Sequence, residues 1–165
     1  MPVRLGAAAG VRNTPDTGGT LAGLRLLLDL PLGQELPLAL RIDLAAAFGP
    51  SAHDLVLGSV GGGLSIFVWA RALPALALRF GPRLFVAHGW AFGADVAGAD
   101  RQSEEVQVGA GLVVGADVAL APGVELILEV EVGTHLLGLE YVVTAGRSGF
   151  LGAYWGGDLA LAFAL

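Results

Sequence analysis

The composition of this chain excludes several classes of protein before any motif is considered. Its 165 residues are 55% hydrophobic with a mean hydropathy of +0.71, which is high for a domain that folds in water. The net charge of −6 argues against nucleic acid as a partner, and the absence of cysteine excludes disulfides and thiolate metal sites.

Glycine and proline content argues against a helical membrane bundle. The chain has 26 glycines and 8 prolines, and its longest uncharged run, residues 55–70, carries three consecutive glycines. That run is also shorter than the roughly 20 apolar residues that a helix needs to cross a bilayer. A very apolar chain without a spanning helix is typical of a transmembrane β-barrel, because only helices and closed barrels satisfy their backbone in lipid.

The first half of the chain contains four segments in which apolar residues alternate with polar or small ones. They cover residues 3–12, 20–30, 38–48 and 55–71. A period of two is typical of strands with one apolar face. The glycine run 61–63 predicts a bulge or bend in the fourth segment, since glycine weakens a regular strand.

The second half contains four further alternating segments, at residues 76–88, 105–120, 124–136 and 150–165. Pro82 lacks the N–H that a ladder needs and predicts a local irregularity. We expect the long polar stretch 89–104 to be a solvated loop, although it could bind a partner or a cation. Together the segments predict an all-β, eight-stranded antiparallel up-and-down transmembrane barrel.

The segment VELILEVEVGTHL, residues 124–136, sets three carboxylates among valines and leucines. Glu125, Glu129 and Glu131 fall on one face and the aliphatic residues fall on the other. The same division holds in every segment. The face opposite the apolar ladder carries the acids Asp29, Asp43, Asp117, Glu125, Glu129, Glu131 and Asp158 and the arginines Arg4, Arg12, Arg25, Arg41, Arg71, Arg79 and Arg83.

These charged faces predict which side of the barrel meets lipid. They are diluted with Gly and Ala, which suits the narrow lumen of eight strands. An arginine on the lipid side costs about 2–4 kcal/mol at the bilayer midplane. We therefore expect the charges to line the lumen and the aliphatic ladders to face lipid, and not the reverse arrangement of a soluble barrel. Compact proline-containing turns alternate with more polar connections, which places both termini in the periplasm.

The chain ends in YWGGDLALAFAL, where Leu159, Leu161, Phe163 and Leu165 alternate with small residues. This ending resembles the C-terminal signal read by the barrel-assembly machinery. Over its whole length the chain resembles the small eight-stranded outer-membrane barrels, the group that includes the transmembrane domain of outer-membrane protein A. The resemblance implies a single domain, residues 1–165, that resides as a monomer in the outer membrane of a Gram-negative bacterium. Its precursor would carry a signal peptide that this sequence lacks.

The resemblance further implies that an interior network of arginines and carboxylates plugs the lumen. The expected partners are Glu129 and Glu131 with Arg79 and Arg83, Arg25 with Asp43, and Asp29 with Arg41, and Asp117, Glu125 and Asp158 complete the set. Purely structural pairing explains such a network, because an uncompensated buried charge is costly. A gating or ion-passing role is the alternative. We expect Trp69, Trp90, Phe92, Tyr141 and Trp155 to lie at the membrane interfaces.

An enzymatic role finds little support. Some small barrels hydrolyse acyl chains of lipid A and need a serine paired with a histidine. Here Ser51, His53 and Asp54 share one connection, while His88 and His135 have no serine two positions on. The glycine run lacks the residues of a phosphate loop. We therefore expect no catalytic residues, no cofactor and no metal.

The sequence thus predicts an integral outer-membrane barrel with a structural or surface-interaction role. Its partners would be the lipid bilayer or detergent and the assembly machinery, and not nucleic acid. A narrow channel for ions or small solutes is the alternative, and a lipid A acyl hydrolase is a third reading.

Overall fold

The computed structural model describes residues 2–16, 18–33, 37–50, 55–94, 100–138, 140–143 and 146–165. Eight strands close into one barrel, in the spatial order β1-β10-β7-β6-β5-β4-β3-β2. Their bounds are β1 (Arg4–Thr14), β2 (Gly19–Pro31), β3 (Leu38–Pro50), β4 (Val56–Leu73), β5 (Leu76–Ala94), β6 (Asp100–Ala121), β7 (Val124–Leu137) and β10 (Gly152–Ala164). None of the described residues forms a helix long and apolar enough to cross a membrane.

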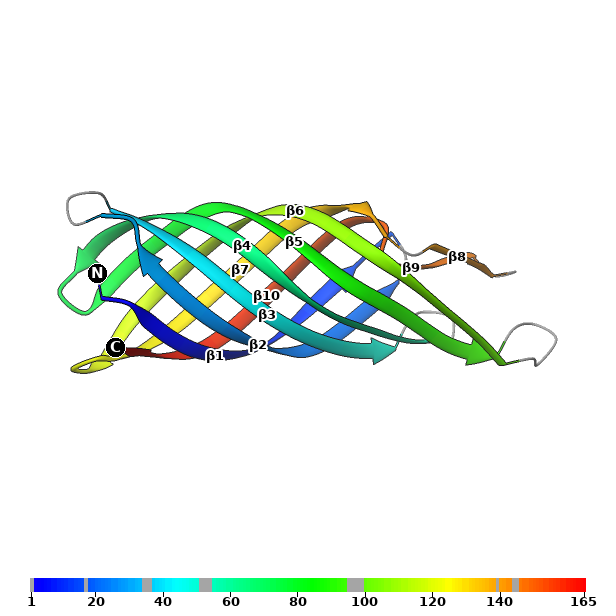
Figure 1. Cartoon of the computed structure of the whole chain (residues 1–165), viewed down its shortest axis with the longest axis horizontal. Helices are drawn as coiled ribbons and strands as arrows, with labels where there is room; N and C mark the ends of the chain where they lie inside the picture. Colours follow the sequence, from blue (N-terminus) through cyan, green and yellow to red (C-terminus); the bar gives the residue numbers. More distant parts are fainter. Residues whose placement is uncertain are drawn as a thin grey trace.

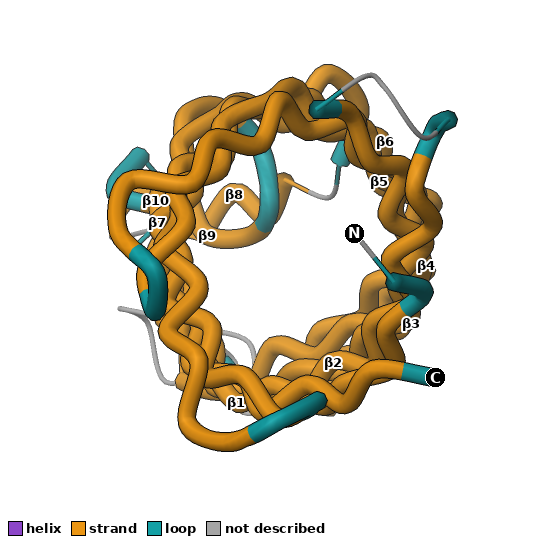
Figure 2. The backbone as a smooth tube through the Cα atoms, turned by 90° about the vertical axis from the view of Figure 1, so that its left-hand side faces the viewer, coloured by secondary structure: helices purple, strands orange, loops and turns teal. Residues whose placement is uncertain are grey.

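Every barrel strand pairs antiparallel with its neighbours, and β1 closes the sheet against β10. Figure 2 shows the strands as a continuous ring around a central axis. Both termini lie at the same end of the cylinder, which we call the terminal end, and the opposite end is the loop end (Figure 1). The predicted eight-stranded antiparallel barrel is confirmed.

The strands are staggered strongly around the cylinder. A path that starts at His88 in β5 and follows paired residues through the other seven barrel strands returns to β5 at Leu78, ten residues before its start. A stagger of this size requires the strands to tilt by roughly 35–45° from the barrel axis. The tilt is visible in Figure 1.

Alternation along each strand sorts the side chains into an inner and an outer face. The inner face buries charged groups together with a small apolar cluster of Ala8, Leu27, Ile127, Ala160 and Ala162. The outer face is a belt of aliphatic ladders, in which Leu24, Leu44 and Leu84 are 68%, 63% and 61% exposed. A surface of this kind suits hydrocarbon and not water. The aliphatic side chains therefore do not converge in the interior as a soluble barrel requires.

The polar stretch 89–104 is not the long loop that the sequence predicts. Strand β5 continues to Ala94 and β6 begins at Asp100, and the two pair from Gly89 with Glu105 up to Ala94 with Asp100. Figure 1 shows this ribbon projecting at the loop end. Backbone hydrogen bonds can extend a strand pair whatever the polarity of its side chains. The prediction used side-chain polarity to end one strand and begin the next, and it therefore made both strands too short.

The expected loop between the seventh and eighth segments also contains regular structure. Strands β8 (Glu140–Val143) and β9 (Gly146–Gly149) form a separate two-stranded hairpin at the loop end (Figure 1). The chain then turns through residues 150 and 151 and enters β10. This hairpin was not predicted, because four-residue strands give too few repeats for a period to be recognised.

The glycine run 61–63 does not produce the predicted bulge. Its pairing with β3 and with β5 keeps one register throughout. The shift in β4 falls instead between Arg71 and Leu73, close to a turn. Near Pro82 the pairing of β4 with β5 is interrupted between Ser65 and Val68 without a change of register, as expected for a residue that lacks an N–H donor.

Candidate functional site

The lumen is filled by an ion-pair network that extends through most of the barrel's length. It joins the arginines Arg4, Arg12, Arg25, Arg41, Arg79 and Arg83 to the carboxylates Asp29, Asp43, Asp117, Glu125, Glu129, Glu131 and Asp158. Alternation along tilted strands brings these groups to one axis, because every second side chain points inward.

Arg4 occupies the terminal end of the network. Its guanidinium donates hydrogen bonds to Asp117 Oδ2 at 2.7 Å, to Asp29 Oδ2 at 2.8 Å and to Glu125. Trp69 Nε1 donates to the same Asp117 oxygen at 2.9 Å, and the Arg4 guanidinium lies over its ring at 5.2 Å. Trp69 therefore belongs to the lumen, and its predicted place at a membrane interface is wrong. Ser65 and Phe67 face inward and precede Trp69 at intervals of two residues. The alternation in the sequence therefore already indicated that Trp69 faces inward.

Arg41 and Arg79 form the middle of the network. Arg41, which is fully buried, donates to both oxygens of Asp29 at 2.5 and 2.9 Å and to Glu129. Arg79 Nη1 lies 3.2 Å from Glu129 Oε1. The Phe67 ring lies against both guanidinium groups, at 5.1 Å from Arg41 and 5.5 Å from Arg79. Contact with an aromatic ring stabilises the two arginines at close range.

Arg83 and Arg25 continue the network toward the loop end. Arg83 donates to Asp43 Oδ1 at 2.6 Å and to Glu131 Oε2 at 2.5 Å. Arg25 Nη2 lies 3.3 Å from Asp43 Oδ2, and its other terminal nitrogen donates to Asp158. Arg83 and Arg25 therefore each bridge at least two carboxylates, which provides the pairing that a buried charge requires.

An aromatic layer lies next to these charges, on the side of the loop end. Tyr154 donates its hydroxyl proton to Glu131 Oε1 at 2.6 Å. The Arg12 guanidinium lies 4.8 Å from the Tyr154 ring and 4.9 Å from the Phe85 ring. The His135 ring is buried and packs 4.9 Å from Tyr154. This layer lies between the ion pairs and the apolar side chains that close the loop end of the lumen.

An apolar plug closes the loop end of the lumen. Leu21, Leu57, Ala91 and Phe150 form one buried cluster, in which Leu57 and Phe150 are 0% and 1% exposed. Phe150 reaches the mouth because the nearby glycines before and after it, Gly149 and Gly152, adopt positive φ angles of 138° and 85°. Such angles are open to glycine and rare for other residues, and they turn the chain from β9 back into the barrel.

Inward-facing glycines provide the space for the charged side chains. A Cβ atom on Gly10 would collide with the Asp158 carboxylate, and one on Gly63 would lie 2.9 Å from both Arg83 and Asp43. The dilution of the charged faces with glycine thus has a steric cause. Gly63 in the run 61–63 illustrates it, because it makes room for two charged side chains while the strand keeps its register.

Many of the ion pairs cross the lumen and do not follow the sheet. Arg41 in β3 reaches Glu129 in β7, the strand diametrically opposite in the barrel order. Arg83 in β5 reaches Glu131 in β7 past the intervening strand β6. The network therefore ties together strands that share no backbone hydrogen bonds.

The structure brings together the three expected sets of partners. Arg79 contacts Glu129, Arg83 contacts Glu131, Arg25 contacts Asp43 and Arg41 contacts Asp29. It also places Asp117, Glu125 and Asp158 in the network, with Glu125 at the partly open terminal mouth. Sequence reasoning did not assign Tyr154, Phe67 or Phe85 to the site, although alternation places all three on the inner face.

The histidines do not assemble a hydrolytic centre among the described residues. His88 faces outward and its Nε2 lies 3.3 Å from Glu104 Oε2, whereas His135 is enclosed by Phe85, Phe150 and Tyr154. Ser51, His53 and Asp54 lie outside the described residues. Across the described ranges, no group of three or more His, Asp or Glu side chains could hold a metal ion.

A closed barrel with a charged lumen and an aliphatic belt has the fold of the small eight-stranded outer-membrane β-barrels. The crystal structure of Neisserial surface protein A matches with a TM-score of 0.66 and 16% identity, covering 99% of this chain and 96% of that one.

Two further solved structures share the fold. A major outer-membrane protein of Thermus thermophilus matches with a TM-score of 0.63 and 18% identity over 99% of this chain and 98% of that one. The attachment invasion locus protein Ail of Yersinia pestis matches with a TM-score of 0.54 and 11% identity over 98% and 97%. No protein-family model and no curated protein sequence matches the chain.

Proposed function

We propose that this chain is an integral outer-membrane barrel whose lumen is closed and whose role is structural or surface-interacting. The observation that carries the proposal is the filled lumen. Layers of paired charges and an apolar plug occupy the interior, so the surfaces available for function are the outer belt and the two ends. The belt anchors the protein in lipid and the loop end presents the β8–β9 hairpin and the β5–β6 ribbon (Figure 1).

Three features support the remaining parts of the proposal. Two proteins of similar fold are named as a surface protein and as an attachment protein, which fits a role at the cell surface. The alternating C-terminal strand suits recognition by the barrel-assembly machinery of a Gram-negative bacterium. Within the described part of the chain, the charges of the lumen network pair with one another, which suits a monomer without catalytic residues or cofactor.

Insertion and conductance test this function together. The purified chain is refolded into lipid vesicles and followed by heat-dependent gel mobility and circular dichroism, and then placed in a planar bilayer. A folded β-barrel that inserts and passes no stepwise current is the expected result. A chain that stays monomeric in water without detergent would contradict membrane embedding.

A narrow channel is the second candidate, and one observation favours it. A cavity of about 50 Å³ lies among Arg12, Arg25, Glu131 and Asp158. Since one water needs roughly 10–15 Å³, it has room for a few waters within the charged layers. Bilayer recordings of Glu129→Gln and Arg83→Gln test this candidate. Stepwise conductance in the parent that changes in both variants would favour the channel over the closed scaffold.

The placement of His88 and His135, the two histidines in the described part of the chain, disfavours a lipid A acyl hydrolase. The test of this candidate is direct. Mass spectrometry of lipid A from cells that express the chain should show unchanged acyl chains. Loss of an acyl chain that depends on His88 would contradict the non-catalytic proposal.

A further inference from the structure

His135 is a buried titratable side chain that the ion-pair network does not use. It is 4% exposed, and among the described residues neither of its ring nitrogens makes a hydrogen bond of good geometry. The backbone of Gly152, its pairing partner in β10, contacts the ring only at a geometry too poor for a hydrogen bond. Buried polar groups are nearly always paired in folded proteins, so an exception of this kind needs an explanation.

Aromatic side chains enclose the His135 ring. The ring centroids of Tyr154, Phe85 and Phe150 lie 4.9, 5.4 and 6.2 Å from its own. Such an enclosure suits a neutral imidazole, whose ring packs as an apolar plate. It does not suit an imidazolium, because both N–H groups of the charged ring need acceptors.

The charged and titratable groups around this enclosure come from several elements. They are Arg12 of β1, Arg83 of β5, Glu131 of β7, Tyr154 of β10 and Asp16 between β1 and β2, whereas the neighbouring position in β6 is the uncharged Gly109. Glu131 already pairs with Arg12 and Arg83 and accepts the Tyr154 hydroxyl. A proton on His135 would therefore add a second cation to the layer of Arg12.

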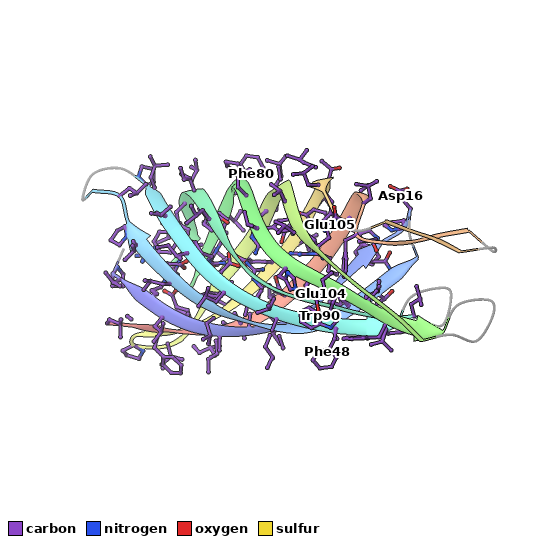
Figure 3. The ribbon with its side chains drawn as sticks, turned by 45° about the vertical axis from the view of Figure 1, so that its right-hand side comes forward. Asp16, Phe48, Phe80, Trp90, Glu104 and Glu105 are labelled. Carbon is purple, nitrogen blue, oxygen red and sulfur yellow. The ribbon has the colours of Figure 1, made fainter. Side chains whose placement is uncertain are left out.

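Asp16 does not neutralise that cation inside the lumen. Figure 3 shows Asp16 at the loop end, where it is exposed to water. Its carboxylate accepts a hydrogen bond from Ala153 N at 2.9 Å. The rings of Phe85 and Tyr154 are also engaged, since the Arg12 guanidinium lies over both.

Phe150 can swing away from this enclosure without disturbing the barrel. Phe150 and Leu151 belong to neither β9 nor β10. The glycines on either side of them, Gly149 and Gly152, have φ angles of 138° and 85°. Short segments between such positions absorb the backbone rotation of a hinge. Burial in the apolar plug therefore contributes most of what holds the Phe150 ring in the mouth.

We propose that His135 is a proton sensor that controls the Phe150 plug and the adjoining β8–β9 hairpin. A neutral ring packs against Phe150 and the plug stays closed. When His135 takes a proton from the medium, the arrangement in which Phe150 swings away and water reaches the imidazolium becomes favoured. Phe150 directly follows β9, so the hairpin then loses an anchor. The inference rests on the proposed surface role and adds its regulation.

The direction and size of the effect follow from the uptake of one proton. An imidazole in water has a pKa of about 6.5, so the open arrangement gains a proton as the pH falls below that value. The ratio of open to closed molecules should then rise by up to about tenfold per pH unit, and it should be nearly constant above about pH 7. Solvated carboxylates titrate near pH 4, so a window of about pH 5–8 isolates the histidine.

Thiol labelling in nanodiscs measures the opening. The chain has no cysteine, so an Ala91→Cys variant carries a single thiol inside the plug, where Ala91 is 1% exposed. A water-soluble thiol reagent labels the inserted barrel, and each rate is divided by the rate of the same variant unfolded in urea at the same pH. We expect this ratio to rise about thirtyfold from pH 8 to pH 5.

Histidine variants in the same background assign the change. His135→Gln keeps a polar side chain that is neutral across the window, and the labelling ratio should lose its pH dependence. His135→Phe fills the same enclosure and should give the same flat profile, so a folding defect of one variant leaves the other. The double variant His53→Gln/His88→Gln removes the other two histidines of the chain and should keep the full pH dependence.

Hydrogen exchange tests the part of the hairpin. The exchange rates of the β8–β9 amides, divided by their intrinsic rates, should rise over the same pH range. Amides that keep their full protection at pH 5 would overturn control of the hairpin.

Other outcomes would overturn the sensor itself. A flat labelling ratio in an inserted parent barrel would refute it and leave the closed scaffold intact. The same holds for a pH dependence that persists in both neutral His135 variants or disappears in the double variant. A failure of the proposed function looks different, because the chain would then not insert or would pass stepwise current at pH 8.

Discussion

Replacing Arg41 with methionine should destabilise the barrel more than any single charge change at its rim. Arg41 is fully buried and donates to both oxygens of Asp29 and to Glu129 on the opposite strand. Methionine keeps most of the length and apolar stem of the side chain and removes the charge. The two carboxylates then lose their shared partner. Asp29 keeps Arg4 and Arg79, whereas Glu129 keeps Arg79 as its nearest remaining arginine.

The size of the effect follows from this loss of pairing. Removing one member of a buried ion pair costs about 3–5 kcal/mol when the other member stays buried without compensation. Arg4 and Arg79 remain close to the two carboxylates, so we expect a loss near the lower end of this range. The double variant Arg41→Met/Asp29→Asn removes a positive and a negative charge together. Its loss should be smaller than the sum of the two single losses by a coupling of about 0.5–3 kcal/mol.

Urea unfolding of the barrel in lipid vesicles measures these free energies, with the fluorescence of the three tryptophans as the signal. Arg71→Met is the matched control, because Arg71 is exposed at the terminal rim, and it should change stability by no more than about 0.5 kcal/mol. A loss below about 1 kcal/mol for Arg41→Met, or strict additivity in the double variant, would refute the view that the network is tightly paired.

Three further predictions concern the belt, the glycines and the plug. Leu159→Arg, at the centre of β10, should cost about 2–4 kcal/mol in vesicle unfolding, whereas Leu165→Arg at the rim should cost about 0–1 kcal/mol; equal losses would contradict a lipid-facing belt. Gly10→Ala should lower stability and weaken the contact of Asp158 with its arginine, because the new Cβ meets that carboxylate, and an unchanged urea midpoint would argue against this packing. Phe150→Ala should leave bilayer conductance at baseline, since the charged layers still close the lumen, and new stepwise currents would show that the plug is the principal seal.

Most of the fold could be predicted because alternation with a period of two fixes both the strands and their faces. A strand displaced by one residue would put Arg41 or Glu129 into lipid, so the charged positions set the inner face without ambiguity. The same alternation already placed Trp69 inside. The general preference of tryptophan for membrane interfaces gave the wrong position, because its Nε1 has a carboxylate partner in the lumen.

What could not be predicted depends on contacts between strands distant in sequence. Glycines 61 and 63 suggested a bend, whereas the opposing strands show that they make space for neighbouring side chains. The hairpin β8–β9 and the pairing of residues 89–94 with 100–105 are decided by backbone hydrogen bonds, which leave no period in the side chains.

The bonds that cross the lumen have a consequence for how the cylinder is completed. Arg41 and Glu129 cannot meet while the sheet is open, and Arg25 gains Asp158 only when β10 has docked. A seven-stranded sheet in a bilayer would therefore hold ionised groups without counterparts. Strand β10 pairs with the free edge of β1 and also brings Asp158 to Arg25. An incomplete barrel is therefore unstable, and closure of the barrel is cooperative.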